Sequence, residues 1–397
     1  MIATIFFWIL IVSLAILAWT YAGFPIVLFI LAKLFKKKHK MSNKFEPKAT
    51  LMIMTYNEAK TIEAKLKNSL KLKYPKNKLE IFVVDSASDD GTAQIAKRFA
   101  KKHKNVRLIQ QKQRKGKASA INFGMKYASG DIVMITDGNA MMHPAALKKI
   151  VRHFVDPKVG GVCGRFEARN LKGTATAAGG GIYWKIEKFL RKNESDLDSC
   201  IHMSGEITSL RKAAYKKVDE QSLTEDFDMA INLRRRGYRI IYEPDAVVFE
   251  PAPTSIQDLT IQKKRIVIGT WQTLGKYKCM LFNPKYGWYG SMIIPSHKLF
   301  QITTPFFFIL VFISTVVTYL LTQNILFFYF LAIQAVAYIL AAVSYPLTKT
   351  NTFKNTRFFV FLKYFTAVNL ICLQGFFDFV RKKRAVTWKK IESSREF

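Results

Sequence analysis

The chain has 397 residues, which is enough for one mid-sized globular domain with additional elements. Its 62 Lys and Arg residues exceed its 28 Asp and Glu residues, so the net charge is +34. This balance favours anionic partners such as phosphates or acidic lipid headgroups, although a generally charged surface explains it equally well. The 4 cysteines form no Cys-x-x-Cys pair, which argues against a disulfide framework or a zinc site and fits a reducing compartment.

An almost uninterrupted apolar run covers residues 2–35. One membrane span needs about 20 residues, so we predict a single long transmembrane helix within residues 1–36, bent near Gly23 and Pro25. The run lacks a charged start and is too long for a cleaved signal peptide. Five lysines lie at or just after its end, and the positive-inside rule places them and the following domain in the cytosol: Lys33, Lys36, Lys37, Lys38 and Lys40.

Between about residues 48 and 250, short apolar runs alternate with helical patterns. This order predicts an α/β fold with a mostly parallel sheet and helices on both faces. The expected strands are 49–54, 81–84, 106–110, 132–136 and 159–163, and the expected helices are 60–70, 92–101, 118–127 and 145–154. Such a sheet binds ligands beyond the carboxyl ends of its strands, and here those ends carry the unusual polar residues.

Polar motifs follow the first two predicted strands. The first strand ends in the segment TYNE at 55–58, and the second runs into DSASDDGT at 85–92. Small and acidic residues at such a point can cap the next helix, which accounts for Ser88 or Asp89. Capping does not require Asp85, whose carboxylate can bond a base or ribose edge, as carboxylates do at the switch points of such sheets.

A basic loop and an acidic loop come next. Cations around Gly116, just before a predicted helix, suit a phosphate, although lysines are common throughout this chain. The fourth strand runs into Asp137-Gly138-Asn139, where a carboxylate and an amide two residues apart can both bind a hard cation. The same three residues also form an ordinary turn.

Two further motifs lie near the end of the predicted domain. Thr224 can cap the helical stretch that Glu225 and Asp226 open. The functional interpretation makes Asp226 a general base, because direct displacement at an anomeric carbon needs a carboxylate that accepts the proton of the attacking hydroxyl. Gln262 and Arg265 share one face of a later helix, for which the alternative is a solvated basic helix at the membrane surface.

In this order the motifs closely resemble those of the family 2 glycosyltransferases with a GT-A fold, over about residues 46–300. The matching segments are TYNE at 55–58, VVDSASDDGT at 83–92, GKASAINFG at 116–124, TDGNAMMHPAAL at 136–147, VGGVCGRF at 159–166, SGEITSLRKAAY at 204–215, TEDFDMAINLRRRGYR at 224–239, EPDAVVFEPAPTS at 243–255 and QKKRI at 262–266. The resemblance implies a Rossmann-like GT-A domain over residues 46–280. It also implies an inverting, metal-dependent transfer of a sugar from a nucleotide-diphosphate donor, for which UDP is the family's usual nucleotide.

The resemblance also assigns a role to each matching residue. The donor would contact Thr55, Tyr56, Glu58, Asp85, Asp90, Lys117, Asp137, Gln262 and Arg265. Asp226 would be the catalytic base with Glu225 beside it, and the acceptor would lie over Ser204, Gly205 and Glu206. A Mg²⁺ or Mn²⁺ ion would bind Asp137 and Asn139. Asn139 stands where the family commonly has a second aspartate, so the ion would meet one negative charge less and bind more weakly.

The last quarter of the chain is apolar. We expect an interfacial segment over 281–298 and helices within 299–380, at about 299–322, 325–345 and 357–380. The third carries Lys363, Asn369, Gln374 and Asp378, and its crossing would put the basic tail, residues 381–397, outside the cell. We therefore expect that segment to lie along the interface or to be re-entrant, with a cytosolic tail. Lys363 can line a polar path or reach toward headgroups.

The expected partners are a nucleotide-sugar donor, the cell membrane and a lipid or glycan acceptor, with no nucleic acid, because no aromatic-bearing sheet motif or recognition helix is present. Two acceptors stay open. One is a growing polysaccharide, as in hyaluronan, chitin or poly-N-acetylglucosamine synthases; the other is a lipid or lipid-linked glycan that receives one sugar. Ile266 replaces the tryptophan of the processive enzymes, which puts processivity in doubt.

Two other classes of function compete with an active enzyme. A catalytically inactive family member is motivated by Asn139 and Ile266. A basic, membrane-tethered binding protein is motivated by the net charge of +34. The second class leaves Asp85, Asp137 and Asp226 unexplained, because carboxylates at a polyanion site would repel the ligand.

Overall fold

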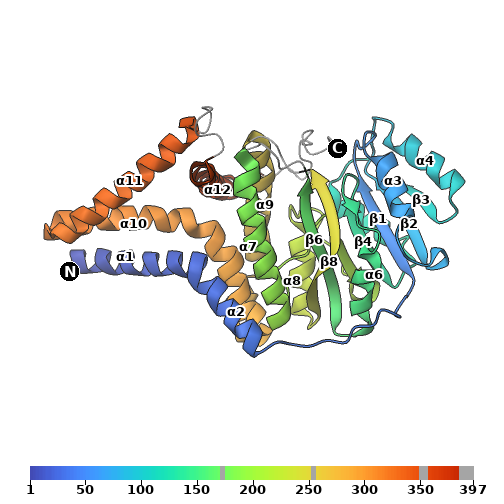
Figure 1. Cartoon of the computed structure of the whole chain (residues 1–397), viewed down its shortest axis with the longest axis horizontal. Coiled ribbons are helices and arrows are strands. Elements are labelled where there is room, and N and C mark those ends of the chain that lie inside the picture. Colours follow the sequence, from blue (N-terminus) through green and yellow to red (C-terminus); the bar gives the residue numbers. More distant parts are fainter. Residues whose placement is uncertain (170–174, 252–255, 348–355, 384–397) are drawn as a thin grey trace.

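The computed structural model describes residues 1–169, 175–251, 256–347 and 356–383. Figure 1 shows an α/β domain built on one sheet, with long apolar helices to one side of it. Two long helices, α7 (Ala175–Leu197) and α9 (Ile256–Lys276), stand between the sheet and the apolar helices. The basic tail expected over 381–397 lies outside the described residues from position 384 onward.

The sheet has eight strands in the order β3-β2-β1-β4-β7-β6-β8-β5. Strands β3, β2, β1 and β4 are parallel, β7 is antiparallel to both of its neighbours, and β6 and β8 are again parallel. The predicted α/β class is therefore confirmed. The bounds are β1 Ala49–Thr55, β2 Leu79–Asp85, β3 Val106–Gln110, β4 Ile132–Asp137, β5 Met141–Met142, β6 Val159–Arg169, β7 Thr208–Arg211 and β8 Arg239–Pro251.

Strand β1 shows why the sheet is covered on both faces. All seven of its residues are buried, as expected for a central strand with helices above and below. Leu51 and Ile53 belong to one hydrophobic core, and Met52 and Met54 belong to the other. Because side chains alternate along a strand, these two sets point to opposite faces of the sheet.

The helices of the domain cover those two faces. The first core includes residues of α3 (Ile62–Leu70), α4 (Thr92–Lys102) and α6 (Ala146–Val151). The second includes residues of α5 (Lys117–Met125) and α8 (Glu225–Arg235). Each of the four helices predicted between residues 60 and 154 is present. The last is shorter than expected, because the chain tightens into a 3₁₀ turn at Arg152–Val155.

Four helices are long and apolar enough to cross a membrane, judged by length and composition in the described part of the chain: Ile2–Leu34, Tyr289–Thr322, Ile325–Leu347 and Arg357–Val380. The first consists of α1 (Ile2–Ala18), a π-helical turn at Trp19–Gly23 and α2 (Phe24–Leu34). Figure 1 shows α1 and α2 meeting at an angle, which confirms the predicted bend. The π-helical turn accounts for it, because one extra residue interrupts the regular hydrogen-bond ladder.

The second apolar helix begins earlier than the sequence indicated. Tyr289–Ile293 and Pro295–Phe300 form π-helical turns that run directly into α10 (Gln301–Thr322). Residues 289–298, expected as an interfacial segment, are thus the inner end of one continuous helix. Helices α1 and α10 run side by side, and α11 (Ile325–Leu347) follows after a tight turn (Figure 1).

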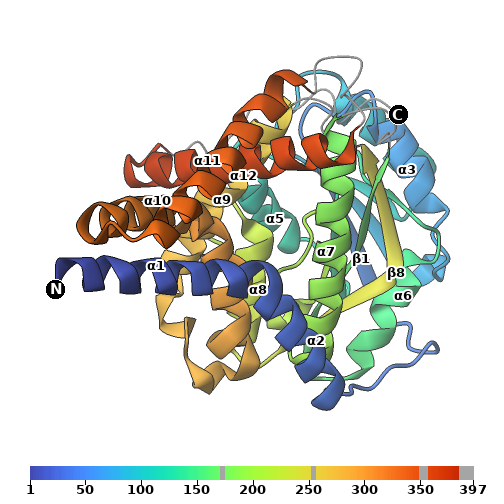
Figure 2. The same ribbon diagram turned by 60° about the vertical axis from the view of Figure 1, so that its left-hand side comes forward.

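Helix α12 (Arg357–Val380) differs in direction from the other apolar helices. In Figure 1 it is seen nearly end-on, whereas α1 and α10 extend across the view, and Figure 2 shows it crossing α9 near α7. Its polar residues contact protein. Asn369 accepts a hydrogen bond from Thr304 (2.9 Å), Asp378 forms an ion pair with Lys264, and the Lys363 amine lies 4.8 Å from the centre of the Tyr345 ring.

The segment between α2 and the sheet is bound to the domain. The Lys37 amide donates to the carbonyl of Asp196 (2.8 Å), and its amine pairs with Asp198 (3.4 Å). His39 and His153 share a hydrogen bond of 2.7 Å. These contacts hold the lysine-rich segment, and with it the N-terminal helix, in a defined position relative to the sheet.

Candidate active site

Two predicted site carboxylates lie at the same edge of the sheet. Asp85 ends β2 and Asp137 ends β4, and β1 lies between these strands with Thr55 paired to Asp85 and Met54 paired to Asp137. Neighbouring strands are about 4.8 Å apart, so the two carboxylates are about two strand spacings apart. The parallel order of β2, β1 and β4 explains why residues so distant in sequence share one edge.

Asp85 is completely buried and already hydrogen-bonded. Its carboxylate accepts from the Ser88 amide (3.1 Å), from Gln110 (3.2 Å) and from the Thr55 hydroxyl (3.3 Å). It therefore shapes the loop that follows β2. Asp85 and Thr55 were expected to contact the donor. A donor molecule would have to share their polar groups with these internal hydrogen bonds.

The loops after β1 and β2 are joined to each other. Asn57 and Asp89 exchange two hydrogen bonds, of 2.8 and 3.1 Å. Asp90, expected at the donor, accepts from the amides of Ala59 (2.9 Å) and Thr92 (3.0 Å). Asn57 has a φ of 55°, a left-handed conformation that asparagine tolerates better than most residues. These contacts join the two loops into a single rigid rim at the edge of the sheet. Asp90 stabilises this rim by accepting hydrogen bonds from both loops.

The basic loop before α5 lies against the same rim. The Arg114 guanidinium lies 3.8 Å from the centre of the Tyr56 ring, a cation–π contact. Glu58 is buried and accepts a hydrogen bond from the Thr61 hydroxyl (2.8 Å). Tyr56 thus lies beside the guanidinium of Arg114, whereas Glu58 stabilises the turn that follows β1.

Lys117 connects three parts of the predicted site. Its amine lies 2.6 Å from Asp137 and 3.4 Å from Glu225, and it donates to the Gly205 carbonyl (3.1 Å). Burial lowers the pKa of Lys117, but the two carboxylates outweigh it and raise that pKa above its ordinary value. The predicted donor, base and acceptor segments therefore meet around one ammonium group.

Asp226 follows Glu225 at the start of α8. Burial, and then the charges of Glu225 and Glu206, raise its pKa to about 7. The pKa of Glu206 is also raised, first by burial and then by Asp137. A carboxylate with a pKa near neutrality can accept a proton from a substrate at physiological pH. Thr224 makes no side-chain cap to this helix and contacts Thr273 instead (3.3 Å), so capping does not account for the motif.

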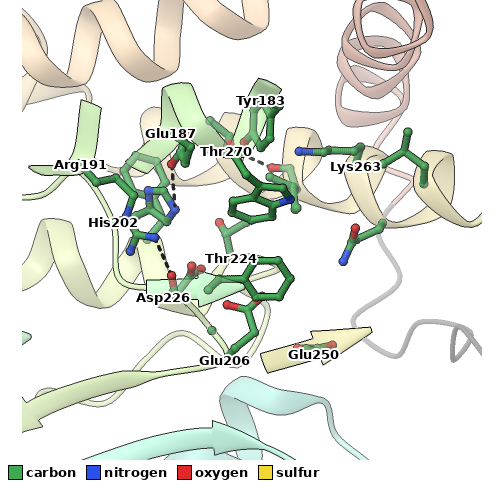
Figure 3. A pocket seen from close by; sticks show the side chains of 18 of the residues that line it. Tyr183, Glu187, Arg191, His202, Glu206, Thr224, Asp226, Glu250, Lys263 and Thr270 are labelled. Atoms are coloured by element: carbon green, nitrogen blue, oxygen red, sulfur yellow. Dashed lines mark hydrogen bonds and ion pairs between the residues drawn. The ribbon is translucent and has the colours of Figure 1, made fainter. Parts of the chain in front are cut away.

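Asp226 lines a pocket of about 170 Å³ between the sheet, α7, α8 and α9. The predicted acceptor residues line it as well: Ser204, Gly205 and Glu206. Figure 3 shows Glu206, Asp226 and Glu250 on one side of the pocket, and Lys263 with Tyr183 on the opposite side. Gln262 also lines the pocket. Arg265 does not, and its buried Nε has no hydrogen-bond partner in the described part of the chain.

Asn139, the second predicted metal ligand, is 2% exposed and donates its side-chain amide to Glu250 (2.8 Å). Asp137 remains 30% exposed at its side chain. Within the described residues, no group of three His, Cys, Asp or Glu side chains is placed to hold a metal ion. A cation at this edge would have Asp137 as its protein carboxylate.

Several residues of the site carry no sequence signal. Lys65 of α3 is completely buried beneath the Asp137 loop, where its amine donates to Thr136 (3.0 Å) and to the Ala140 carbonyl. Burial lowers its pKa to about 7. In the sequence it is one of several lysines in a helical pattern, and nothing distinguishes it from the exposed Lys67. Glu250 and Lys263 lie in the matched segments EPDAVVFEPAPTS and QKKRI, but the sequence assigned no role to either of them.

Comparisons with known proteins show sequence similarity to one family of transferases. The family model for glycosyl transferase family 2 matches residues 50–219. A poly-beta-1,6-N-acetyl-D-glucosamine synthase of Staphylococcus aureus (strain COL) is 31% identical over 229 residues, which cover 57% of this chain and 55% of the relative. The corresponding synthase of Staphylococcus epidermidis is 30% identical over the same length. The chain thus matches about half the length of these curated relatives.

A solved structure resembles the whole chain. The mannosyltransferase of Pyrobaculum calidifontis, in complex with GDP-Man and Mn²⁺, superimposes with a TM-score of 0.71 at 23% identity. The match covers 95% of this chain and 100% of that one. At this identity the likeness establishes the fold.

Proposed function

We propose, from the match of residues 50–219 to the family model for glycosyl transferase family 2, that the chain transfers a sugar, with inversion, from a nucleotide-diphosphate donor to an acceptor at the membrane. The observation that carries the proposal is the position of Lys117 between Asp137 and Glu225, next to Asp226. It brings the residues expected at the donor phosphates and at the acceptor hydroxyl to one place.

The donor would lie along the carboxyl edge of β1, β2 and β4. Tyr56 and Arg114 offer a stacked surface there, and Asp85 at the end of β2 is the carboxylate that we assign to the nucleoside. Lys117 would exchange part of its contact with Asp137 for the donor diphosphate. UDP is the nucleotide we favour, because the family resemblance implies it.

A Mg²⁺ or Mn²⁺ ion fits beside Asp137, whose carboxylate is partly exposed. When bound, the ion would neutralise charge on the departing diphosphate. Asp137 would hold the ion together with the Oδ1 of Asn139, whose Nδ2 donates to Glu250. The Pyrobaculum mannosyltransferase, whose complex contains Mn²⁺, has the same fold and supports this choice.

Asp226 would act as the general base. The acceptor O–H bond breaks and its proton passes to the Asp226 carboxylate, while the oxygen bonds to the anomeric carbon from the face opposite the nucleotide. The bond from that carbon to the diphosphate breaks, and its electron pair leaves with the nucleotide. A positioned base typically contributes about 10²–10⁴ in rate.

The acceptor would approach from the side of the apolar helices. Lys298 and Tyr364 line the pocket of Asp226, and each belongs to a helix that is long and apolar enough to cross a membrane. We propose a multi-pass protein of the cell membrane, with the catalytic domain in the cytosol on the side of the lysines that follow α2. The crosswise course of α12 supports an interfacial helix in preference to a fourth span (Figure 1).

A transfer assay tests the function. The full chain in detergent and lipid is incubated with labelled nucleotide sugars and Mn²⁺ or Mg²⁺, and both free sugar and lipid-bound product are measured. Metal-dependent turnover of one donor is the expected result. A ladder of products would identify a polysaccharide synthase, and one discrete glycolipid would identify single transfer. Absence of turnover with every nucleotide sugar would favour an inactive family member.

A further inference from the structure

The pocket that contains Asp226 has two sides of opposite charge. Carboxylates occupy the side next to the sheet, where Figure 3 shows Glu206, Asp226 and Glu250. Cations gather around the remainder of the lining, which includes Arg191, Lys263 and Lys298. A ligand that fills the pocket therefore meets a proton acceptor at one end and positive charge at the other.

The cations are not neutralised by ion pairs. The Lys263 amine lies 3.9 Å from the centre of the Tyr183 ring, and the Lys298 amine lies 5.8 Å from that of Phe227. Among the described residues, neither lysine has a carboxylate partner. Burial lowers the pKa of Lys263 to about 8. Glu187 acts electrostatically on both lysines without forming an ion pair with either. A desolvated ammonium group with so distant a counter-charge is unfavourable, so an anionic ligand would stabilise it.

Arg191 adds a third cation. It is 2% exposed, and its guanidinium donates to Ser204 (2.8 Å) and to the Cys163 sulfur (3.2 Å). Burial, and then the charges of Lys298 and Arg191, hold the pKa of His202 well below its usual value. The same two cations therefore act on one buried imidazole from within the pocket.

Among the described residues that line this side of the pocket, the carboxylate is that of Glu187, and it is already engaged. Glu187 lies 3.2 Å from the His297 Nε2 and 3.7 Å from the His202 Nε2. His297 also contacts Glu194. The single negative charge of Glu187 therefore acts on His297 and on both lysines, which leaves positive charge in excess on this side of the pocket.

The origin of the lining residues indicates where a ligand enters. Lys298 lies in the helix Tyr289–Thr322 and Tyr364 in the helix Arg357–Val380, both apolar enough to cross a membrane. At the boundary between a membrane and water, lipid headgroups contact the protein, and lysine side chains and tyrosine rings are favoured there. A soluble acceptor would not require the pocket to be built partly from such helices.

We infer that Lys263 and Lys298 bind the phosphate of a membrane lipid whose headgroup hydroxyl is the acceptor, while Arg191, whose guanidinium is hydrogen-bonded to Ser204, Cys163 and Cys200, adds positive charge to the same pocket. The inference rests on the proposed glycosyltransferase function and names its acceptor class. The headgroup hydroxyl loses its proton to Asp226 and bonds to the anomeric carbon, and the nucleoside diphosphate leaves with the electron pair of the broken bond. The lipid phosphate is not altered and serves as the anchor.

The test compares two lipids that share a hydroxyl and differ in phosphate. The full chain is reconstituted in phosphatidylcholine vesicles that contain either phosphatidylglycerol or diacylglycerol, with the nucleotide sugar that the wild-type chain turns over. Wild type should glycosylate phosphatidylglycerol at least about tenfold faster, because a charge-assisted contact contributes roughly that factor or more. Lys263→Gln with Lys298→Gln should lower the ratio of the two rates by about tenfold or more.

Lys278→Gln with Lys285→Gln removes two exposed lysines and serves as the matched control. It should keep the wild-type ratio, because general attraction to anionic vesicles would respond to both pairs alike. Equal rates on the two lipids, an unchanged ratio in the Lys263 and Lys298 variant, or product formed on neutral oligosaccharide alone would each overturn the inference while the transferase function stands. Failure to turn over any nucleotide sugar would instead refute the proposed function.

Discussion

Asn139 donates a hydrogen bond from its side-chain amide to Glu250 at the end of β8, across 2.8 Å. An aspartate at position 139 would place a second carboxylate against Glu250 in a site that is almost completely buried. The amide is therefore compatible with Glu250 in a way that the family's usual aspartate would not be. This contact explains the departure from the Asp-x-Asp pattern without assuming that activity has been lost.

Asn139→Asp should destabilise the protein, because it replaces a hydrogen bond by repulsion between two carboxylates. We expect a loss of about 1–3 kcal/mol in unfolding free energy at pH 7, the size typical of a buried polar group that loses its partner. Thermal unfolding of the solubilised chain measures it. The double variant Asn139→Asp with Glu250→Gln restores a donor–acceptor pair and should recover most of the loss, so equal melting temperatures of the single variant and wild type would contradict the pairing.

Asp226→Asn should lower kcat by about 10²–10⁴, because the amide cannot accept the acceptor proton. Donor affinity, measured by titration of nucleotide against thermal stability, should change little. Asp219→Asn alters an exposed carboxylate a few residues away and controls for general charge effects. Wild-type turnover by Asp226→Asn would remove the assignment of the base.

Activity should fall at acid pH. The folded-state pKa of Asp226 is raised from 3.8 to about 7, so its proton-accepting form predominates above about pH 7 and is lost as pH falls through that value. A profile of kcat/KM against pH should therefore decline about tenfold per unit below pH 7. A profile that stays flat down to pH 5 would show that the base has an ordinary carboxyl pKa.

Lys65→Met should change how stability depends on pH. In the folded protein, burial lowers the pKa of Lys65 from 10.5 to about 7, so between these values the unfolded chain binds the proton more readily. Stability from this group therefore rises with pH from about 7 to 10.5, by up to about 1.4 kcal/mol per pH unit. As pH falls from 10.5 this stability is lost, and the loss is complete once pH has fallen through 7. Denaturant unfolding at pH 7 and pH 9 should show a smaller increase in Lys65→Met than in wild type.

The exposed Lys67→Met provides the control for that comparison, since its side chain is 63% exposed in the same helix. Lys65→Met should also reduce kcat, because the hydrogen bonds of Lys65 to Thr136 and Ala140 hold the loop that carries Asp137. An identical pH response in Lys65→Met and Lys67→Met would show that Lys65 is not desolvated.

The strands, their polar ends and the motif order could all be predicted from the sequence, because they are local properties. Alternation between apolar runs and helical patterns predicted four helices and five of the six strands that begin before residue 163, with ends displaced by a few residues; the two-residue strand β5 was missed. Parallel strands with crossover helices bring their carboxyl ends to one edge of the sheet. The position of Asp85 and Asp137 at the same edge could therefore be predicted from the sequence. Gly23 and Pro25 likewise indicated where the first helix bends.

Contacts between distant segments could not be predicted in this way. Asn139 and Glu250 are 111 residues apart, and Lys117 and Gly205 are 88 apart. Whether they meet depends on the strand order, in which β7, β6 and β8 follow β4. Periodicity states which residues are buried, but it contains no information about which buried residues face each other. Lys65, Lys263 and the crosswise course of α12 became visible only when the segments were packed together, because desolvation and charge pairing are properties of that packing.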